Sequence, residues 1–482
     1  MYDVIVIGGG PAGVTAALRA RELGASVALV ERDHLGGTCT NDGCVPTRVL
    51  AKAARLLRNA DQFGNYGLVG ERPVVDLQTL MSRTQEIVYK IHEKKQLIQH
   101  LNNSDVSVYV GVGEARFVDP HTIALNGEMQ LQAGNFIICA GGHARRLNFP
   151  GAEHTLTHSD IWSLRTLPRS VLVIGGAATG CQLASILAAF GSQVTIFEIG
   201  PRLLAVEDED LSLGVKEAFE TRGIEIVTGF GGVERVEKLE QGLRLHYIKD
   251  GQTLTRDADA VTLAVGWPGN VDTLGLTAAG VEVERGYIVV DDGFRTNVEH
   301  IFAAGDITGR MMLVQSAGFE ARTAAENAVL GSSQPYQHYL VPHGSFTDPE
   351  YASVGLTEAK ARDGHDCAVA VIPFAALDRA VIDGHTEGFF KLVASAETHR
   401  ILGAHVVGEQ AVEIVQFVAA GMAADIWIEQ LAELEIAYPT YTAIVGLAAR
   451  RLVHELGVMP ISPQWRSLGR SYAAEWERAE DY

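Results

Sequence analysis

The stretch that decides the fold is Gly36-Gly37-Thr38-Cys39-Thr40-Asn41-Asp42-Gly43-Cys44-Val45-Pro46-Thr47. It carries two cysteines and leads into a helix-forming segment, residues 47–60, rich in alanine, leucine and arginine. The unpaired N–H groups and positive dipole end of a helix start lower the pKa of a nearby thiol, and Arg48 would favour a thiolate further. Two unrelated buried cysteines or half of a metal site are the alternatives. Because the sequence has no second cysteine pair with zinc spacing, the stretch predicts a reactive dithiol.

The bulk composition limits the class of protein. A length of 482 residues predicts about three domains of roughly 150 residues each. The net charge of −20 argues against nucleic acid or an anionic membrane surface as a partner. Five cysteines, an odd number, do not form a secreted disulfide framework. Residues 2–7 already have a strand pattern, and no apolar run approaches the ~18–20 residues of a membrane span, so we expect a cytoplasmic protein without a signal peptide.

The N-terminal region carries a dinucleotide-binding pattern. The strand of residues 2–7 leads into Gly8-Gly9-Gly10-Pro11-Ala12-Gly13, a helix to about Leu23 and a second strand that ends at Glu31. Such a turn lets the backbone approach a pyrophosphate at a helix N-terminus, and the acid accepts hydrogen bonds from a ribose diol. The residues predicted to bind are Gly8, Gly10, Gly13 and Glu31.

The same pattern occurs a second time. A strand at residues 170–174 precedes Gly175-Gly176-Ala177-Ala178-Thr179-Gly180, a helix and a strand that ends at Glu198. The first glycine of the turn and the acid at the strand end are 23 residues apart in both copies (31 − 8 and 198 − 175). Because each copy predicts one binding unit, we expect two bound dinucleotides. Glu198 would accept hydrogen bonds from a ribose 2′-hydroxyl and repel a 2′-phosphate, which favours NADH over NADPH. Arg202 weakens this preference for NADH because it adds a positive charge nearby. An acid at a strand end can also be an ordinary solvated surface residue.

Three features occur together: Gly-Gly-Thr-Cys-x4-Cys-x-Pro, two dinucleotide patterns, and a strand that ends in Ala304-Gly305-Asp306. In this combination the chain resembles the flavoprotein disulfide reductases, the class I pyridine nucleotide-disulfide oxidoreductases that include dihydrolipoyl dehydrogenase, glutathione reductase and mercuric reductase. The resemblance implies FAD on the first pattern and NAD(P)H on the second. It implies that NAD(P)H reduces FAD, which reduces a Cys39–Cys44 disulfide. Cys44 would then be the thiolate in contact with the flavin, and Cys39 would exchange with substrate.

The resemblance also implies an α/β fold with two Rossmann-like dinucleotide-binding domains and a C-terminal α+β dimerisation domain. Residues 76–102 are expected to form one long amphipathic helix. The helical region from Ala411 to Ala424 and onward to Trp427 is too apolar for an exposed face, so we expect a homodimer through this domain. The expected domains are residues 1–150 for FAD binding, 151–270 for NAD(P) binding, 271–339 for a central domain that completes the FAD site, and 340–482 for the interface domain with its C-terminal tail.

Further binding residues follow from matching the motifs. In the family the aspartate of Ala-Gly-Asp, here Asp306, bonds the ribityl chain, and the backbone near Leu313 to Ala317 lies against the flavin ring. Trp267 stands where arginine is usual. No metal-binding residues are expected. The resemblance assigns Gly37, Thr38, Gly141, Asp306, Leu313 and Ala317 to FAD, and Gly175, Gly180, Gln182, Glu198 and Gly266 to NAD(P).

The sequence departs from the family at the acid–base pair. The family's His-Pro-Thr-x-x-Glu motif, whose histidine moves the proton of thiol exchange across the dimer, is here Tyr438-Pro439-Thr440-Tyr441-Thr442-Ala443. Tyr438 replaces the histidine and Ala443 the glutamate, and a tyrosine with a pKa of about 10 is a poor base at pH 7. Mercuric reductases also lack the histidine. Their C-terminal vicinal cysteines are missing here, since residues 456–482 contain no cysteine, and no N-terminal heavy-metal-binding domain is expected.

Further departures flank the expected flavin. Arg48 replaces a lysine and Gln182 its glutamate partner, which would leave the guanidinium freer to stabilise anionic flavin or thiolate. Ala178 replaces an aromatic residue that gates the nicotinamide pocket, so we expect a more open pocket.

These observations predict an FAD-dependent NAD(P)H oxidoreductase that passes electrons through the Cys39–Cys44 disulfide to a small disulfide or a soft metal ion. The metal ion is favoured because a thiolate binds it without the help of a base. One alternative is a diaphorase-like NADH oxidase or transhydrogenase, and a second is a redox sensor with vestigial turnover. The tail, residues 460–482, could cap the active-site mouth or form plain surface, and surface is the simpler expectation.

Overall fold

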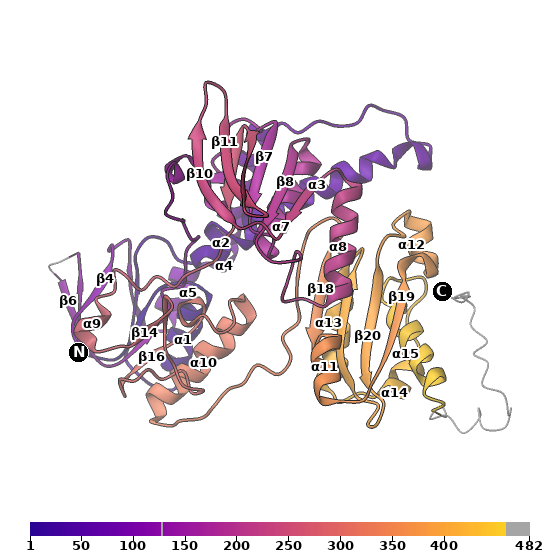
Figure 1. Ribbon diagram of the computed structural model, residues 1–482. Coiled ribbons are helices and arrows are strands. Elements are labelled where there is room, and N and C mark those ends of the chain that lie inside the picture. Colours follow the sequence, from indigo (N-terminus) through magenta and orange to yellow (C-terminus); the bar gives the residue numbers. More distant parts are fainter. Residues whose placement is uncertain (127–128, 459–482) are drawn as a thin grey trace.

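The computed structural model describes residues 1–126 and 129–458, and its elements form three groups around separate sheets (Figure 1). The expected tail at residues 460–482 lies outside the described residues. The first sheet has the order β3-β2-β1-β6-β5-β4, with β16 paired to β6. Its strands are β1 (Tyr2–Ile7), β2 (Val27–Glu31), β3 (Val106–Val110), β4 (Ala115–Asp119), β5 (Thr122–Leu125), β6 (Met129–Ile138) and β16 (Ile301–Ala303).

The centre of this sheet is parallel and covered on both faces. β1 pairs in parallel with β2 and β6, and β6 pairs in parallel with β16. Val4 and Val6 of β1 contact one apolar cluster while Ile5 and Ile7 contact another, as the two-residue period of a strand requires. On the first face, α1 (Pro11–Glu22) and α10 (Val314–Leu330) lie against each other through buried alanines. The first dinucleotide pattern therefore forms a Rossmann-like unit.

A second parallel sheet, in the order β13-β7-β8-β9, contains the repeated pattern. Its glycine turn joins β7 (Ser170–Ile174) to α7 (Ala178–Phe190), and the chain returns through β8 (Gln193–Glu198). The remaining strands are β9 (Glu225–Thr228) and β13 (Ala260–Leu263), and a separate antiparallel sheet contains β10 (Gly232–Lys238), β11 (Leu243–Lys249) and β12 (Gln252–Ala258).

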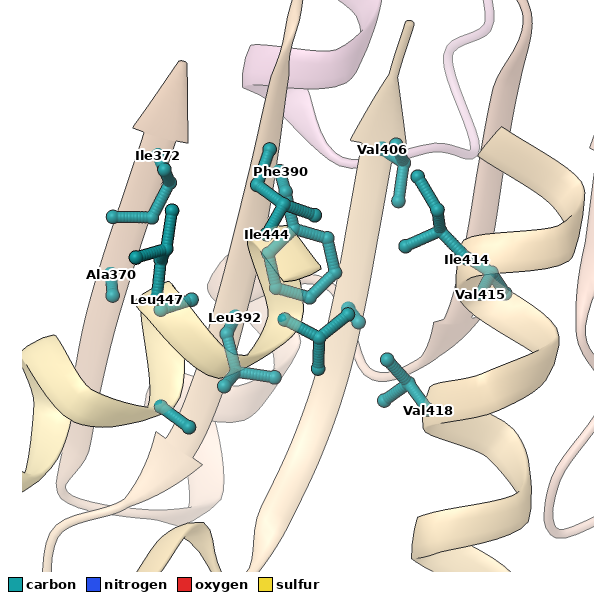
Figure 2. Packing of buried hydrophobic residues seen from close by; sticks show 14 of the residues in the cluster. Ala370, Ile372, Phe390, Leu392, Val406, Ile414, Val415, Val418, Ile444 and Leu447 are labelled. Carbon is teal, nitrogen blue, oxygen red and sulfur yellow. The ribbon is translucent and has the colours of Figure 1, made fainter. Parts of the chain in front are cut away.

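The C-terminal group is an antiparallel sheet in the order β17-β18-β21-β20-β19. α13 (Ala411–Ala423) and α15 (Ala443–Glu455) cover one of its faces, where Ile414 and Ile444 pack near Phe390 of the sheet (Figure 2). The strands are β17 (His343–Ser345), β18 (Tyr351–Gly355), β19 (Cys367–Pro373), β20 (Phe389–Ser395) and β21 (Ile401–Val407).

Much of the apolar surface that suggested a dimer is buried within the chain itself. Ile414, Val415 and Val418 of α13 have at most 1% exposure because they pack on β18 and β21. Trp427 is the large apolar side chain of this region that remains exposed. The apolar character of α13 therefore reflects a buried helix, and it does not by itself indicate a dimer.

Two helix boundaries differ from expectation. The helix expected over residues 76–102 is interrupted at Gln96, whose φ of 44° is left-handed, so that α4 (Leu77–Lys95) and α5 (Leu97–Asn103) are separate. The helix after the dithiol, α3 (Cys44–Asp61), begins at the second cysteine itself. Within the described residues, no helix combines the length and apolar character needed to cross a bilayer.

Phe390→Ala should destabilise the C-terminal domain. The ring is fully buried between β20 and the covering helices, and removing a buried phenylalanine side chain costs about 3–5 kcal/mol. Calorimetry at fixed protein concentration should show a lower Tm for this domain. Val371→Ala on the neighbouring strand, where the side chain is 39% exposed, is the matched control. Equal losses in the two variants would show that this cluster is not a core.

Candidate active site

The two cysteines lie where the chain crosses the first glycine turn. Cys39 is half-buried in the short helix α2 (Gly37–Asn41), and Cys44 is exposed at the first position of α3. A Cβ placed on Gly37, which has a φ of 56°, would come within 2.8 Å of the Gly10 Cα. Glycine is required at position 37, whereas a Cβ on Gly10 would lie at an ordinary contact distance of 3.7 Å from the Gly37 Cα. The structure thus brings the predicted dithiol directly against the predicted FAD-binding turn.

The two thiols differ in acidity. A hydrogen bond from the Cys44 thiol, followed by the charge of Lys95, lowers the pKa of Cys39 to about 7, although burial and Asp306 oppose this shift. The same hydrogen bond raises the pKa of Cys44. The expectation that Cys44 is the thiolate in contact with the flavin concerns the cofactor-bound protein, and it stays a prediction. A lowered pKa makes a thiol a better nucleophile at neutral pH, and the role of Cys39 as the exchanging thiol likewise stays a prediction.

Two further segments, which the sequence reasoning missed, hold the loop between the cysteines. On one side, the Trp162 indole donates to the Asp42 carbonyl oxygen at 2.7 Å and the Ser159 hydroxyl donates to its carboxylate at 2.5 Å. The imidazole of His158, in α6 (His158–Ile161), is 3.5 Å from the same carboxylate. On the other side, Lys95 of α4 donates to Thr40. Only the position of Asp42 between the two cysteines hinted at such contacts.

The first dinucleotide pattern fits an adenine dinucleotide. A Cβ on Gly8 would lie 2.3 Å from the Cys139 carbonyl oxygen, and one on Gly13 would lie 1.8 Å from the Gly8 carbonyl oxygen, so only glycine is tolerated. The Glu31 carboxylate accepts a 2.6 Å hydrogen bond from the Gly9 N–H. A cavity of about 90 Å³ lies beside this carboxylate. It is lined by residues that include Gly8, Glu31, Gly113, Ala115 and Asn270.

The second flavin motif lies close to the thiols. Asp306 follows β16 and is near enough to both cysteines to oppose the loss of their protons. Burial raises its pKa, while a 3.0 Å hydrogen bond from the Trp267 indole opposes that rise. Trp267, in the usual arginine position, therefore gives this carboxylate a neutral partner. The other residues expected at FAD are Thr38 in α2, Leu313 at the N-cap of α10, Ala317 in its first turn, and Gly141, where an added Cβ would meet open space.

The second dinucleotide pattern repeats the geometry of the first. The Glu198 carboxylate accepts a 2.6 Å hydrogen bond from the Gly176 N–H, and a Cβ on Gly175 would lie 2.3 Å from the Ala264 carbonyl oxygen. A Cβ on Gly180 would lie 1.8 Å from the Gly175 carbonyl oxygen. Arg202 donates to the main-chain carbonyls of residues 204, 205 and 207, so its guanidinium is already engaged.

Two further residues of the predicted NAD(P) site, Gly266 and Ala178, differ in their surroundings. Gly266 has a φ of 126°, and its carbonyl oxygen accepts from the Arg145 N–H at 3.1 Å. Ala178 is exposed at the start of α7, and the open nicotinamide pocket stays a prediction. Within the described residues, no group of three or more His, Cys, Asp or Glu side chains is placed to hold a metal ion.

The structure gives Gln182 a role different from nucleotide binding. Its amide oxygen accepts hydrogen bonds from the Ser345 hydroxyl and the Phe346 N–H, and its amide nitrogen donates to the Phe346 carbonyl oxygen. The side chain is buried and joins α7 to the C-terminal domain. The assignment of Gln182 to NAD(P) is therefore wrong in this structure, because its polar atoms are engaged by residues 345 and 346.

The guanidinium of Arg48 is not free either. It stacks on the Phe346 ring, 3.5 Å from the centroid, and lies 3.8 Å from the carboxylate of Glu350, which also pairs with Arg55. Gln182 carries no negative charge to balance Arg48, and Glu350 of the C-terminal domain supplies that charge instead. Burial is the main reason why the pKa of Arg48 is lowered and that of Glu350 raised. The expectation of an unpaired cation is corrected.

Tyr438 lies in the C-terminal domain of the chain. Its hydroxyl donates to Asp378 of α12 (Asp378–Asp383), and Ala443 is the first residue of α15. α12 is well separated from α2 in Figure 1, so one chain alone does not bring Tyr438 to the cysteines. Tyr441 is buried, and burial together with Asp383 raises its pKa.

Comparisons with known proteins agree with this geometry. Residues 2–321 match the family model for pyridine nucleotide-disulphide oxidoreductases, and residues 341–449 match the dimerisation domain of the same family. The chain belongs to this family. The family is FAD-dependent and works with a pyridine nucleotide, and as a member of it the chain is an oxidoreductase. The resemblance inferred from the motifs and the α/β fold class are thereby confirmed.

Similar proteins within the family have several activities. The chain is 35% identical to a dihydrolipoyl dehydrogenase from Zymomonas mobilis, over 86% of this chain and 90% of that one. It is 34% identical to a mercuric reductase from Lysinibacillus sphaericus, over 93% and 82%. Among solved structures, the HOCl-induced flavoprotein disulfide reductase RclA from Escherichia coli has a TM-score of 0.83 and 26% identity, covering 93% of this chain and 99% of that one. A Cu(II) complex of RclA has the same TM-score and identity, covering 94% and 99%.

Alkylation of Cys39 should follow its pKa. Because only the thiolate attacks iodoacetamide, the rate in the anaerobically reduced protein should be half-maximal near pH 7 and fall as the pH falls. Peptide mass mapping at each pH separates Cys39 from Cys367, whose pKa is raised mainly by burial and which is the reference thiol in the same sample. A Cys39 profile centred above about pH 8.5, the ordinary thiol value, would contradict the geometry.

Proposed function

We propose that this enzyme takes an electron pair from NADH and passes it through Cys39 and Cys44 to a soft metal ion such as Hg(II), which takes both electrons, or to two Cu(II) ions, which take one each, with a small disulfide as the other acceptor class. The observation that carries the proposal is the replacement of the acid–base pair by Tyr438 and Ala443 in a chain that keeps both cysteines and lowers the pKa of Cys39. The similar mercuric reductase and the Cu(II) complex of RclA support the same direction.

Proton handling is the reason for preferring a metal ion. Reduction of a disulfide needs a proton for each thiol that leaves, and a positioned general acid contributes about 10²–10⁴ in rate. The hydroxyl of Tyr438 donates to Asp378, and a tyrosine, with an ordinary pKa of about 10, is a poor base at neutral pH. Soft metal ions need no such proton because thiolate sulfur binds them directly. Cys39, with a pKa of about 7, would be substantially ionised at neutral pH.

The residues of the two dinucleotide patterns would hold the cofactors. Gly8, Gly10, Gly13 and Glu31 would bind the adenosine and pyrophosphate portion of FAD, and Asp306 its ribityl chain. Bound FAD supplies the relay of an electron pair between nicotinamide and sulfur. Cys44 then belongs to the cofactor side of the pair and Cys39 to the substrate side. A homodimer through the C-terminal domain would complete the site, since Tyr438 could reach the cysteines only from a second copy.

NADH is the proposed electron donor. Glu198, at the end of β8, has the position from which a carboxylate bonds the ribose 2′-hydroxyl and repels a 2′-phosphate. Arg202 could have offset this effect, but its guanidinium is held by three main-chain carbonyls. The Arg202 guanidinium is therefore not available to bind a 2′-phosphate.

An acceptor panel tests the proposal. With NADH as donor, turnover with Hg(II) or Cu(II) should exceed turnover with lipoamide or oxidised glutathione by at least about tenfold, because only the disulfides need the missing acid. Tyr438→His combined with Ala443→Glu should raise disulfide turnover about tenfold or more and leave metal turnover unchanged. Tyr438→Phe is the control for loss of the hydroxyl alone. Fast disulfide turnover by the natural enzyme would overturn the preference for metal.

The exposed Ala178 favours a diaphorase-like activity as the second candidate, because an ungated nicotinamide pocket gives small oxidants access to the cofactor. Cys39→Ser combined with Cys44→Ser separates the two functions. The proposed metal reductase should lose almost all metal-dependent NADH oxidation in this variant, and a quinone dye should measure what the flavin transfers directly. Undiminished metal turnover without the thiols would instead establish the diaphorase.

A further inference from the structure

The last turn of α4 contacts the dithiol loop through two side chains that lie one helical turn apart. The Lys95 Nζ donates to the Thr40 hydroxyl at 2.9 Å, and the His92 Nε2 is 2.7 Å from the amide oxygen of Asn41. Thr40, which directly follows Cys39, is fully buried. The Asn41 amide also donates to the Leu35 carbonyl oxygen at 3.2 Å. The segment after Cys39 is therefore held to α4 by side-chain bonds.

We propose that Lys95 is a positioning residue for the thiol chemistry: it fixes Thr40, the residue that follows Cys39, and holds a positive charge beside the dithiol loop. The inference rests on the proposed dithiol function, but it is independent of which acceptor the dithiol reduces. Arg48 was the cation expected in this role from the sequence. Its guanidinium is instead stacked on Phe346 and placed beside Glu350.

The break between α4 and α5 places Lys95 at the helix end. Gln96 adopts a left-handed φ of 44°, and its N–H donates to the His92 carbonyl oxygen at 2.9 Å, which closes the last turn. A non-glycine residue in this region costs of order 1–3 kcal/mol and is retained where surrounding contacts determine it. A lysine in the last turn also interacts favourably with the negative end of the helix dipole. The strained residue lies directly after the contact that we propose to be functional.

The charged groups around Cys39 determine how strongly its pKa depends on Lys95. Cys44 on α3 donates a hydrogen bond, Lys95 on α4 favours the thiolate, and Asp306 after β16 opposes it. His92 also faces the loop, but burial together with Lys95 lowers its pKa and disfavours a second positive charge. An opposite charge close to an ionisable group shifts its pKa by about 1–3 units. Because Lys95 is exposed and screened by water, we expect about half a unit to one unit.

The test is the pH profile of Cys39 alkylation in the anaerobically reduced holoenzyme, with iodoacetamide as the probe and mass mapping as the readout. Lys95→Met should move the midpoint upward by about half to one pH unit, which at pH 7 lowers the rate by about two- to fivefold. Lys95→Arg should restore the natural midpoint because it keeps the charge. Lys94→Met, which removes the neighbouring exposed cation, should leave the midpoint unchanged.

A merely structural role for Lys95 predicts a different result. It would lower stability in Lys95→Met without moving the Cys39 midpoint, and that outcome would overturn the proposal. Equal shifts in Lys94→Met and Lys95→Met would also overturn it, because they would indicate general surface charge. The reference thiol Cys367 must keep its own profile in every variant. The assay needs no terminal acceptor, so failure of the proposed metal reduction would leave this result interpretable.

Discussion

The close approach of two backbones, at Gly10 and Gly37, is the constraint on which the rest of the active site depends. A side chain at Gly37 would collide with the first dinucleotide turn, so only glycine lets the dithiol loop cross the N-terminus of α1. The crossing fixes where Cys39 and Cys44 lie relative to the predicted pyrophosphate site. Contacts from α4 and α6 are made to this loop, and those from the C-terminal domain are made to α3, the helix that follows it.

Helix α3 transmits that position to the C-terminal domain. It begins at Cys44, and farther along it Arg55 and Arg58 form ion pairs with Glu350, Asp348 and Glu409 of the C-terminal domain. These charges are largely buried, and burying a charge is tolerated only when it is paired. The pairs therefore link the helix of the dithiol to the domain that carries Tyr438. The Gln182 bonds to residues 345 and 346 add a link from the second dinucleotide domain.

Where this chain departs from the family, the new side chains have hydrogen-bonding partners of their own. Trp267 stands where arginine is usual in the family, and its indole donates to Asp306. Gln182 replaces a glutamate, and Glu350 provides the carboxylate beside Arg48. Tyr438 replaces a histidine and bonds Asp378. In the first two positions the site keeps a polar partner, whereas in the third it loses a group that titrates near neutrality.

The sequence by itself determined the two glycine turns, their acids and the paired cysteines, because each depends on residues that are near neighbours along the chain. It also determined the α/β fold class, since strand, turn and helix alternate with clear periods. Tertiary structure alone decided which cation faces which thiol, where Gln182 points and where the helix after residue 76 breaks. These outcomes depend on distances through space between residues far apart in sequence, such as Lys95 and Thr40, which no local pattern encodes.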